Sequence, residues 1–209
     1  MRKEWIGIGT AAGAALLGGA ALYYFQERAT EEPDYRTLRT DGDFQVREYH
    51  EMTIAQTVVH GPRKQALGEG FRRLADYIFA KSRPGEALAM TVPVMQDAGD
   101  PMASDPPLFD DEIEGGWRTR FVMPHGRAES DLPSPPDEVE LVMLPPRRVA
   151  VVSFAGRPDD RDLAEQEDRL RGWLAREGER SESEPEYAFY NSPIIPGPLR
   201  RNEVWLALA

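Results

Sequence analysis

The chain has 209 residues, which is long enough for one well-buried domain and short for two. It contains no cysteine, which excludes disulfides, thiolate metal sites and a cysteine nucleophile. Its formal net charge of −11 argues against a general nucleic-acid-binding protein, because affinity for the phosphate backbone needs a positive face.

The N-terminus carries an uncharged, apolar run from Trp5 to Phe25. Its length matches the roughly 20 residues that a helix needs to cross a bilayer. Trp5 at one end and Tyr23–Phe25 at the other are typical of the two membrane interfaces. Because Arg2 and Lys3 precede the run and acidic residues follow it, the positive-inside rule predicts a cytoplasmic N-terminus and an exported remainder.

Two interpretations of this run stay open. The first is an uncleaved anchor over residues 1–25, then a polar linker over residues 26–33 and a domain over residues 34–209 outside the cytoplasm, in a bacterium in the periplasm. The second is a cleaved signal peptide, whose apolar core is usually about 7–15 residues. The longer run and the lack of a clear small-residue cleavage site favour the anchor.

The first half of the predicted domain begins with residues 44–60, whose alternation and β-branched residues indicate one or two strands. Gly61-Pro62 ends this stretch. A helix is predicted over residues 63–81, because apolar residues recur at helical spacing: Leu67, Phe71, Leu74 and Ile78. Two strands are expected after it, over residues 88–95 and 118–123.

The second half repeats this order. Residues 148–155 indicate an apolar strand, residues 159–177 a helix, and residues 187–190 and 203–208 two closing strands. The repeat predicts duplicated β-α-β-β units. The fold class is therefore α+β, with antiparallel strands curved into a distorted barrel and two helices packed outside it.

Two prolines, Pro93 and Pro193, interrupt predicted strands in the two halves. Neither can donate a hydrogen bond to a ladder, so each is expected at a strand end, an edge or a bulge. Their role stays open between holding the ends of a barrel apart for a ligand and blocking edge-to-edge association.

A set of short segments along the chain carries a family resemblance. The segments are VREY at Val46–Tyr49, GFRRLADYI at Gly70–Ile78, MTVPV at Met90–Val94, FVMP at Phe121–Pro124, PP-x-V at Pro135–Val139, VVSFAG at Val151–Gly156 and YNSP…RRNEVWL at Tyr190–Leu206. Their ordered set resembles the SOUL heme-binding protein family over residues 35–208. The resemblance implies the duplicated fold of bacterial effector-binding domains. It also implies binding of heme or a related tetrapyrrole in an apolar groove beside the first helix, near the loop before the last strand.

Apolar residues for such a groove come from the elements that the resemblance places around it. The heme-groove candidates are Phe71, Leu74, Met90, Met95, Ile194 and Ile195. Each of them is explained equally well as a core residue.

A heme site also needs polar partners and, usually, an axial ligand. One branch of the family has a histidine directly before the tyrosine of the R-x-Y motif, where this chain has Glu48. His50 lies two residues further, on the same face of a regular strand, and is the possible axial ligand. Arg72, Arg200 and Arg201 are the possible propionate partners, with ion pairing or solvation as the other interpretation.

Two functions remain open at this stage. One is a membrane-tethered carrier or buffer of heme or a related tetrapyrrole, with heme as the cofactor and no metal beyond its iron. The alternative is a non-heme module on the effector-binding fold that binds a small molecule or a protein. An enzyme is not expected, because the sequence has no GxSxG, HExxH, phosphate-loop or dinucleotide-binding motif.

Overall fold

The structure, a computed structural model, describes residues 30–98, 116–127 and 129–209. Contacts divide the chain into two units, Met1–Thr30 and Glu31–Ala209, and the second is described here. The predicted membrane segment over residues 1–25 lies outside the described residues. Within the three described ranges, no helix is long and apolar enough to cross a membrane.

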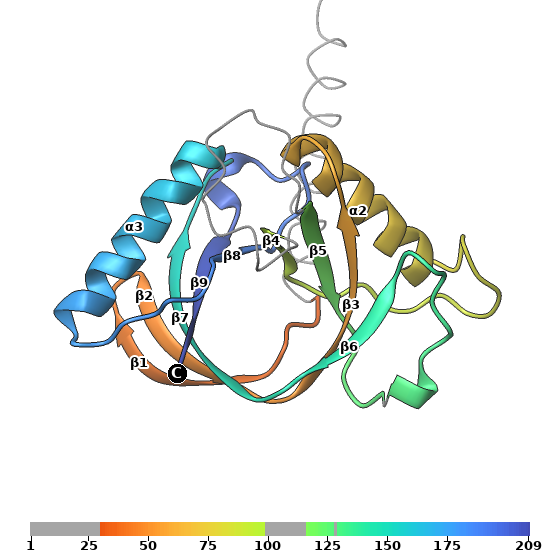
Figure 1. The fold of residues 1–209 in the computed structure, drawn as a ribbon, viewed down its shortest axis with the longest axis horizontal. Helices are drawn as coiled ribbons and strands as arrows, with labels where there is room; N and C mark the ends of the chain where they lie inside the picture. Colours follow the sequence, from red (N-terminus) through yellow and green to blue (C-terminus); the bar gives the residue numbers. More distant parts are fainter. Residues whose placement is uncertain (1–29, 99–115, 128) are drawn as a thin grey trace, which may run out of the picture. The chain divides into compact units, whose positions relative to one another are not determined.

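The second unit is one curled antiparallel sheet with two helices outside it (Figure 1). Its elements are β1 (Tyr35–Asp41), β2 (Phe44–Tyr49), β3 (Met52–Val59), α2 (Arg63–Ile78), β4 (Val94–Ala98), β5 (Trp117–Val122), η1 (Glu129–Asp131), β6 (Glu140–Leu144), β7 (Arg147–Phe154), α3 (Asp160–Arg176), β8 (Glu186–Phe189), η2 (Gly197–Leu199) and β9 (Asn202–Leu208). The nine strands follow the order β1-β2-β7-β9-β8-β4-β5-β3-β6. Because β1 and β6 are edges, the expected barrel is an open half-barrel.

The strand order confirms the duplicated unit. One copy is β3-α2-β4-β5 and the other is β7-α3-β8-β9, and the two copies meet where β4 pairs with β8. Each copy has a leading strand in front, β2 before β3 and β6 before β7; the first was one of the two alternatives for residues 44–60, and the second was not predicted. These leading strands are exchanged, since β2 pairs with β7 and β6 pairs with β3.

The exchange produces one long ladder across the half-barrel. Tyr49 pairs with Arg147 on one side of a short gap, and Met52 pairs with Leu144 in the same register on the other side. The gap falls at Pro145-Pro146, where the chain has no backbone donors. Residues 44–60 are therefore two strands on one line, as one of the two interpretations of the sequence had it.

Helix α2 packs closely on β3 and β5 because of Gly70. A Cβ atom at Gly70 would lie 2.6 Å from the Thr119 hydroxyl oxygen and 3.1 Å from its Cβ, so only glycine fits. Helix α3 begins with a capping box in which the side chains of Asp159 and Asp162 each accept a hydrogen bond from the other's backbone N–H.

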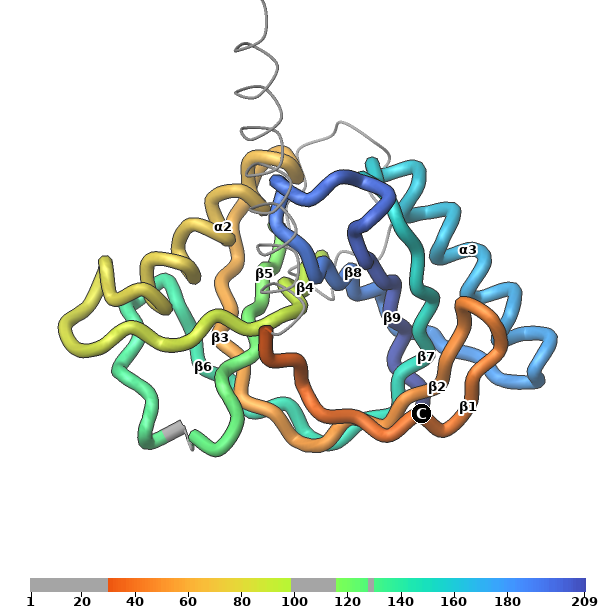
Figure 2. Tube along the Cα trace, turned by 180° about the vertical axis from the view of Figure 1, so that it is seen from behind, coloured from red at the N-terminus to blue at the C-terminus, as the bar shows by residue number. Residues whose placement is uncertain are grey.

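The sheet has an inner face, within the curl, and an outer face that carries the helices (Figure 2). The inner core includes Tyr49, Met95 and Trp205. The outer face has one cluster under α2, which includes Leu74, and another under α3, which includes Trp173. Strand side chains alternate between these faces, so neighbouring residues in a strand have different surroundings.

The two prolines lie outside the strands, as expected, but not at equivalent places. Pro93 directly precedes β4, so the strand predicted over residues 88–95 begins only at Val94. Pro193 lies in the turn after β8. The first proline therefore precedes a strand, and the second follows one.

Candidate functional site

The six predicted groove residues lie in more than one place. Met95 is buried on the inner face with Trp205, whereas Leu74 is buried on the outer face beneath α2. Met90 packs, half-buried, against the same cluster as Leu74. Phe71 lies on α2 with 43% of its surface exposed. The sheet therefore separates Met95 from Leu74, Met90 and Phe71.

Ile194 and Ile195 lie in the loop between β8 and β9. Ile194 is 75% exposed, and its neighbour Ile195 is 3% exposed. Only Ile194 is thus available at the surface, and Ile195 serves as a core residue of the loop.

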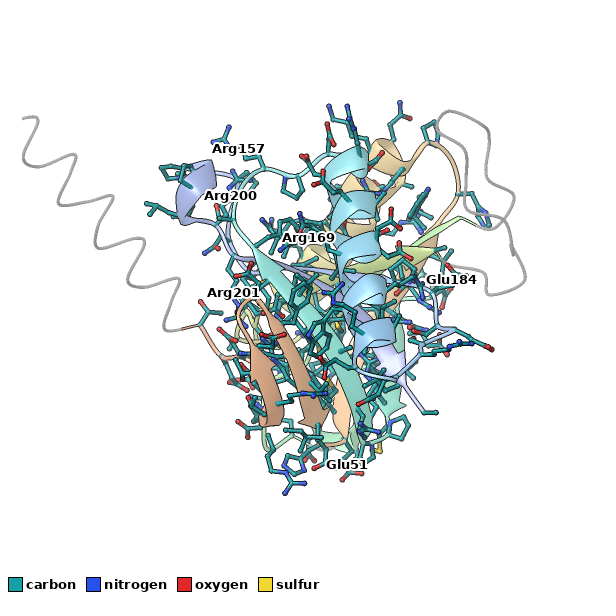
Figure 3. The ribbon with its side chains drawn as sticks, turned by 90° about the vertical axis from the view of Figure 1, so that its left-hand side faces the viewer. Glu51, Arg157, Arg169, Glu184, Arg200 and Arg201 are labelled. Atoms are coloured by element: carbon teal, nitrogen blue, oxygen red, sulfur yellow. The ribbon has the colours of Figure 1, made fainter. Side chains whose placement is uncertain are left out.

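His50 lies outside β2, because the strand ends at Tyr49. The prediction that His50 would lie on the same strand face as Glu48 therefore does not hold, because His50 is not part of the strand. Its neighbour Glu51 lies at the opposite end of the half-barrel from Arg200 (Figure 3). The structure does not bring His50 together with the β8–β9 loop.

The predicted propionate partners all have protein partners. Arg72 forms ion pairs with Glu69 at 2.6 Å and Asp76 at 3.0 Å on the surface of α2. Arg200 donates to the backbone carbonyl of Ile195 at 2.8 Å. Arg201 pairs with the carboxylates of Glu32 and Glu203, each at 3.0 Å, and its guanidinium lies 3.7 Å from the centre of the Tyr190 ring.

The structure brings together a different set of apolar side chains on the outer face, which we call the aromatic strip: Phe71, Phe121, Val94 and Phe189. The Phe71 and Phe121 rings meet edge to face at 5.3 Å. Val94 pairs with Phe121 on one side and with Phe189 on the other, so the strip crosses β5, β4 and β8. Within the strip, Phe121 is buried, Val94 and Phe189 are half-buried, and Phe71 is exposed.

Among the described residues, the strip is open because neither helix covers the middle of the sheet. The main contacts of α2 are with β3 and β5, and those of α3 are with β7 and β9. Strands β4 and β8 lie between the two helices, where the two repeats meet (Figure 1). A flat apolar ligand placed there would contact both repeats.

Arg63, at the start of α2, provides a cation on the same face. Its guanidinium lies 5.2 Å from the Trp117 ring centre and 5.8 Å from that of Tyr187, and it pairs with Asp160 at the start of α3. Tyr187 lies two residues before Phe189 on β8 and therefore on the same face of the strand. Because Arg63 lies over the Tyr187 ring, its guanidinium is next to the end of the strip formed by Phe189. The sequence did not predict Arg63, Phe121, Val94 or Phe189 as site residues, and neither VMQDA nor EYAF has an alternation of apolar and polar residues that would have marked Val94 or Phe189.

The inner face carries a buried ionic centre around the fully buried carboxylate of Glu203. Its six hydrogen-bond donors are Arg47 (2.9 and 3.0 Å), Ser153 (3.0 Å), Arg201 (3.0 Å), Tyr190 (2.8 Å) and Trp205 (2.7 Å). Burial alone would raise the pKa of Glu203, but Arg47, Arg201 and Trp205 hold it below its usual value. We call this set the Glu203 centre.

A second ionic cluster on the inner face joins the two repeats. Arg118 and Arg120 lie 2.7 and 3.0 Å from the carboxylate of Asp97. Arg120 and Arg147 lie 3.1 and 2.5 Å from that of Glu186. These contacts connect β4 and β5 of the first repeat with β7 and β8 of the second. Across the described ranges, no group of three or more histidine, cysteine, aspartate or glutamate residues is arranged to hold a metal ion.

Comparison with known sequences identifies one family. The family model for SOUL heme-binding proteins matches residues 30–207. A search of curated proteins found no match.

Solved structures share the fold at low identity. The C-terminal domain of EcmrR is 14% identical with a TM-score of 0.54, over 84% of this chain and 98% of that chain. An uncharacterized conserved protein from Listeria innocua is 10% identical with a TM-score of 0.56, over 87% and 94%. A hydrolase from the same organism is 11% identical with a TM-score of 0.53, over 86% and 93%. At such identities the similarity shows the fold alone.

Proposed function

Because the chain belongs to the SOUL heme-binding protein family, we propose that it binds heme or a related tetrapyrrole on the aromatic strip. The observation that carries this proposal is the exposed Phe71, held edge to face against Phe121 beside strands β4 and β8, which neither α2 nor α3 covers in the described part of the chain. A macrocycle there would cover Phe71, Val94 and Phe189 and remove apolar surface from water.

The strip fits the apolar face of a porphyrin, and Arg63 at its border would reach a propionate by exchanging its ion pair with Asp160. The three histidines lie elsewhere: His50 follows β2, His60 precedes α2, and the backbone N–H of His125 donates to Glu31. Bound heme would bring an iron that changes oxidation state and binds small ligands. A carrier needs neither property, and the residues of the strip bind the ring without them.

A membrane-tethered carrier or buffer combines this surface with the predicted N-terminal anchor. The tether would hold the domain outside the cytoplasm at the bilayer. A ligand on an open strip leaves more readily than one enclosed in the core, which suits transfer over storage.

The direct test is an absorbance titration with hemin, using residues 30–209 so that the contacts of Glu31 and Glu32 are kept. We expect a shifted Soret band that saturates near one equivalent. Phe71→Ser should weaken binding about tenfold by removing apolar contact area. Phe79→Ser is the matched control, because Phe79 is 46% exposed, forms the C-terminal cap of α2 and lies outside the strip. Equal losses in both variants would contradict the proposed site.

The absence of a histidine from the strip favours one alternative, a non-heme small-molecule or protein interaction module. A hemin titration that matches an unrelated acidic protein would favour it. Ligands that raise the melting temperature of the wild type but not of Phe71→Ser would then identify the chemistry that the strip binds.

A further inference from the structure

The β8–β9 loop (residues 190–201) presents exposed apolar side chains together. Ile194 is 75% exposed and Leu199 is 51% exposed, which makes Ile194 the most exposed large apolar residue in the described part of the chain. Three prolines between and beside them are also partly or fully exposed: Pro193, Pro196 and Pro198. Clustered exposed apolar residues mark surfaces that contact another molecule or a membrane.

Hydrogen bonds hold this loop in shape. Arg200 donates to the carbonyls of Ile195 at 2.8 Å and Pro193 at 2.5 Å, and the backbone of Gly197 accepts from Gly156 at 3.0 Å. Arg201 donates its backbone N–H to Asn191 at 2.7 Å. The two apolar side chains therefore project from a braced loop.

Cationic side chains lie beside the loop. The exposed Arg157 follows Gly156, and its Cγ lies 3.4 Å from the position that a Cβ of Gly197 would take. Arg157, Arg200 and Arg201 lie on one side of the unit, and Glu184 lies on the other (Figure 3). Apolar tips flanked by arginine are typical of protein surfaces that lie in the membrane interface.

The unit also begins at the base of this loop. Glu32 pairs with Arg201 at 3.0 Å, and the carbonyl of Glu31 accepts from the Val92 N–H at 2.9 Å. The predicted membrane segment ends at Phe25, so residues 26–30 join it to Glu31. Five residues span at most about 18 Å. With the proposed tether, this length limits how far Glu31 can lie from the end of the membrane segment.

We propose that the β8–β9 loop docks on the lipid bilayer, with Ile194 and Leu199 in the interfacial region and Arg157 near the lipid phosphates. The inference rests on the proposed tether and adds an orientation to it. The end of the half-barrel that carries Arg157 and Arg200 faces the membrane, and the end that carries Glu51 faces away.

The cysteine-free chain suits a site-specific test. Full-length protein with Ile194→Cys is spin-labelled and placed in nanodiscs that contain anionic lipid, and collision rates with oxygen and with a water-soluble nickel complex are measured. Glu51→Cys is the control at the opposite end (Figure 3). We expect the oxygen-to-nickel ratio to rise severalfold at position 194 on insertion and to stay water-like at position 51.

Three other outcomes overturn the proposal in different ways. Water-like ratios at both positions, in protein that remains with the discs, would overturn the docking and leave the tether. Protein that does not stay with the discs would overturn both. Protection at position 194 in residues 30–209 alone, without lipid or detergent, would show that a second copy covers the loop. Leu199→Cys repeats the test with a second side chain, and Ile194→Glu should lower the ratio measured at position 199.

Discussion

The Glu203 centre and the aromatic strip occupy opposite faces of the same sheet and differ in almost every respect. The centre is buried and its carboxylate has six donors, whereas the strip is partly exposed and apolar. The VREY segment supplies Arg47 to the centre, and the NEVWL segment supplies Glu203 and Trp205. The motifs that carry the family resemblance thus contribute to both faces, because the segments at Gly70–Ile78, Met90–Val94 and Phe121–Pro124 supply Phe71, Val94 and Phe121 to the strip. The strand residues of the strip alternate with inward-facing residues, and Phe71 is added from α2.

The largest expected loss of stability comes from a substitution in the Glu203 centre. Glu203→Gln removes the charge that compensates Arg47, whose side chain is only 3% exposed. Breaking a buried ion pair by removing one partner costs about 3–5 kcal/mol. Urea unfolding of residues 30–209 at neutral pH measures this loss. Glu48→Gln is the control, because Glu48 pairs with Arg36 at the surface, and a similar loss in both variants would contradict the assignment.

The pH dependence of the unfolding free energy tests whether the charge of Glu203 is what stabilises the protein. Arginine partners hold the pKa of Glu203 below its usual value despite burial. Such a carboxyl adds stability above its unfolded pKa, about 4.3, and this stability is lost as pH falls through the lower folded pKa. The difference in unfolding free energy between wild type and Glu203→Gln should therefore be constant from about pH 7 to about pH 5 and shrink in more acid solution. A difference that persists in strong acid would show that lost packing, not lost charge, destabilises the variant.

Gly70 belongs to the outer face, where its close approach to Thr119 fixes α2 and hence Phe71. Gly70→Ala places a Cβ 2.6 Å from the Thr119 hydroxyl, and such overpacking costs about 1–3 kcal/mol. Gly68→Ala on the same helix meets no atom within 4 Å and should stabilise the protein by up to about 1 kcal/mol. Thermal unfolding distinguishes the two variants. Thr119→Ala should recover part of the loss in Gly70→Ala, and no recovery would place the strain elsewhere.

Much of the fold could be predicted from the sequence because its signals are local. The helical spacing of Leu67, Phe71, Leu74 and Ile78 predicted α2, and the repeated order of elements predicted the duplication. The exchange of β2 and β6 between the repeats could not be predicted, because strand pairing is set by contacts far apart in the sequence.

The candidate site was predicted less well for a related reason. Met95 was expected in the groove, but β4 begins after Pro93 in a register that turns Val94 outward and Met95 inward. A shift of one residue exchanges the faces of a strand, and the sequence alone does not fix that register. Phe71 was predicted and lies on the strip, because its place on the flank of α2 follows from helical spacing.

The smallest expected effect is that of the iron itself. Because His50, His60 and His125 lie away from the strip, binding there depends on the ring faces, and hemin and metal-free protoporphyrin should bind with affinities within about twofold. Tryptophan fluorescence quenching measures both ligands, and His50→Ala should change neither. A preference for hemin of about tenfold, with a six-coordinate spectrum that His50→Ala abolishes, would move the site to the β2–β3 junction. The strip would then be an exposed seam between the repeats, and the β8–β9 loop would lie at the end of the half-barrel opposite the ligand.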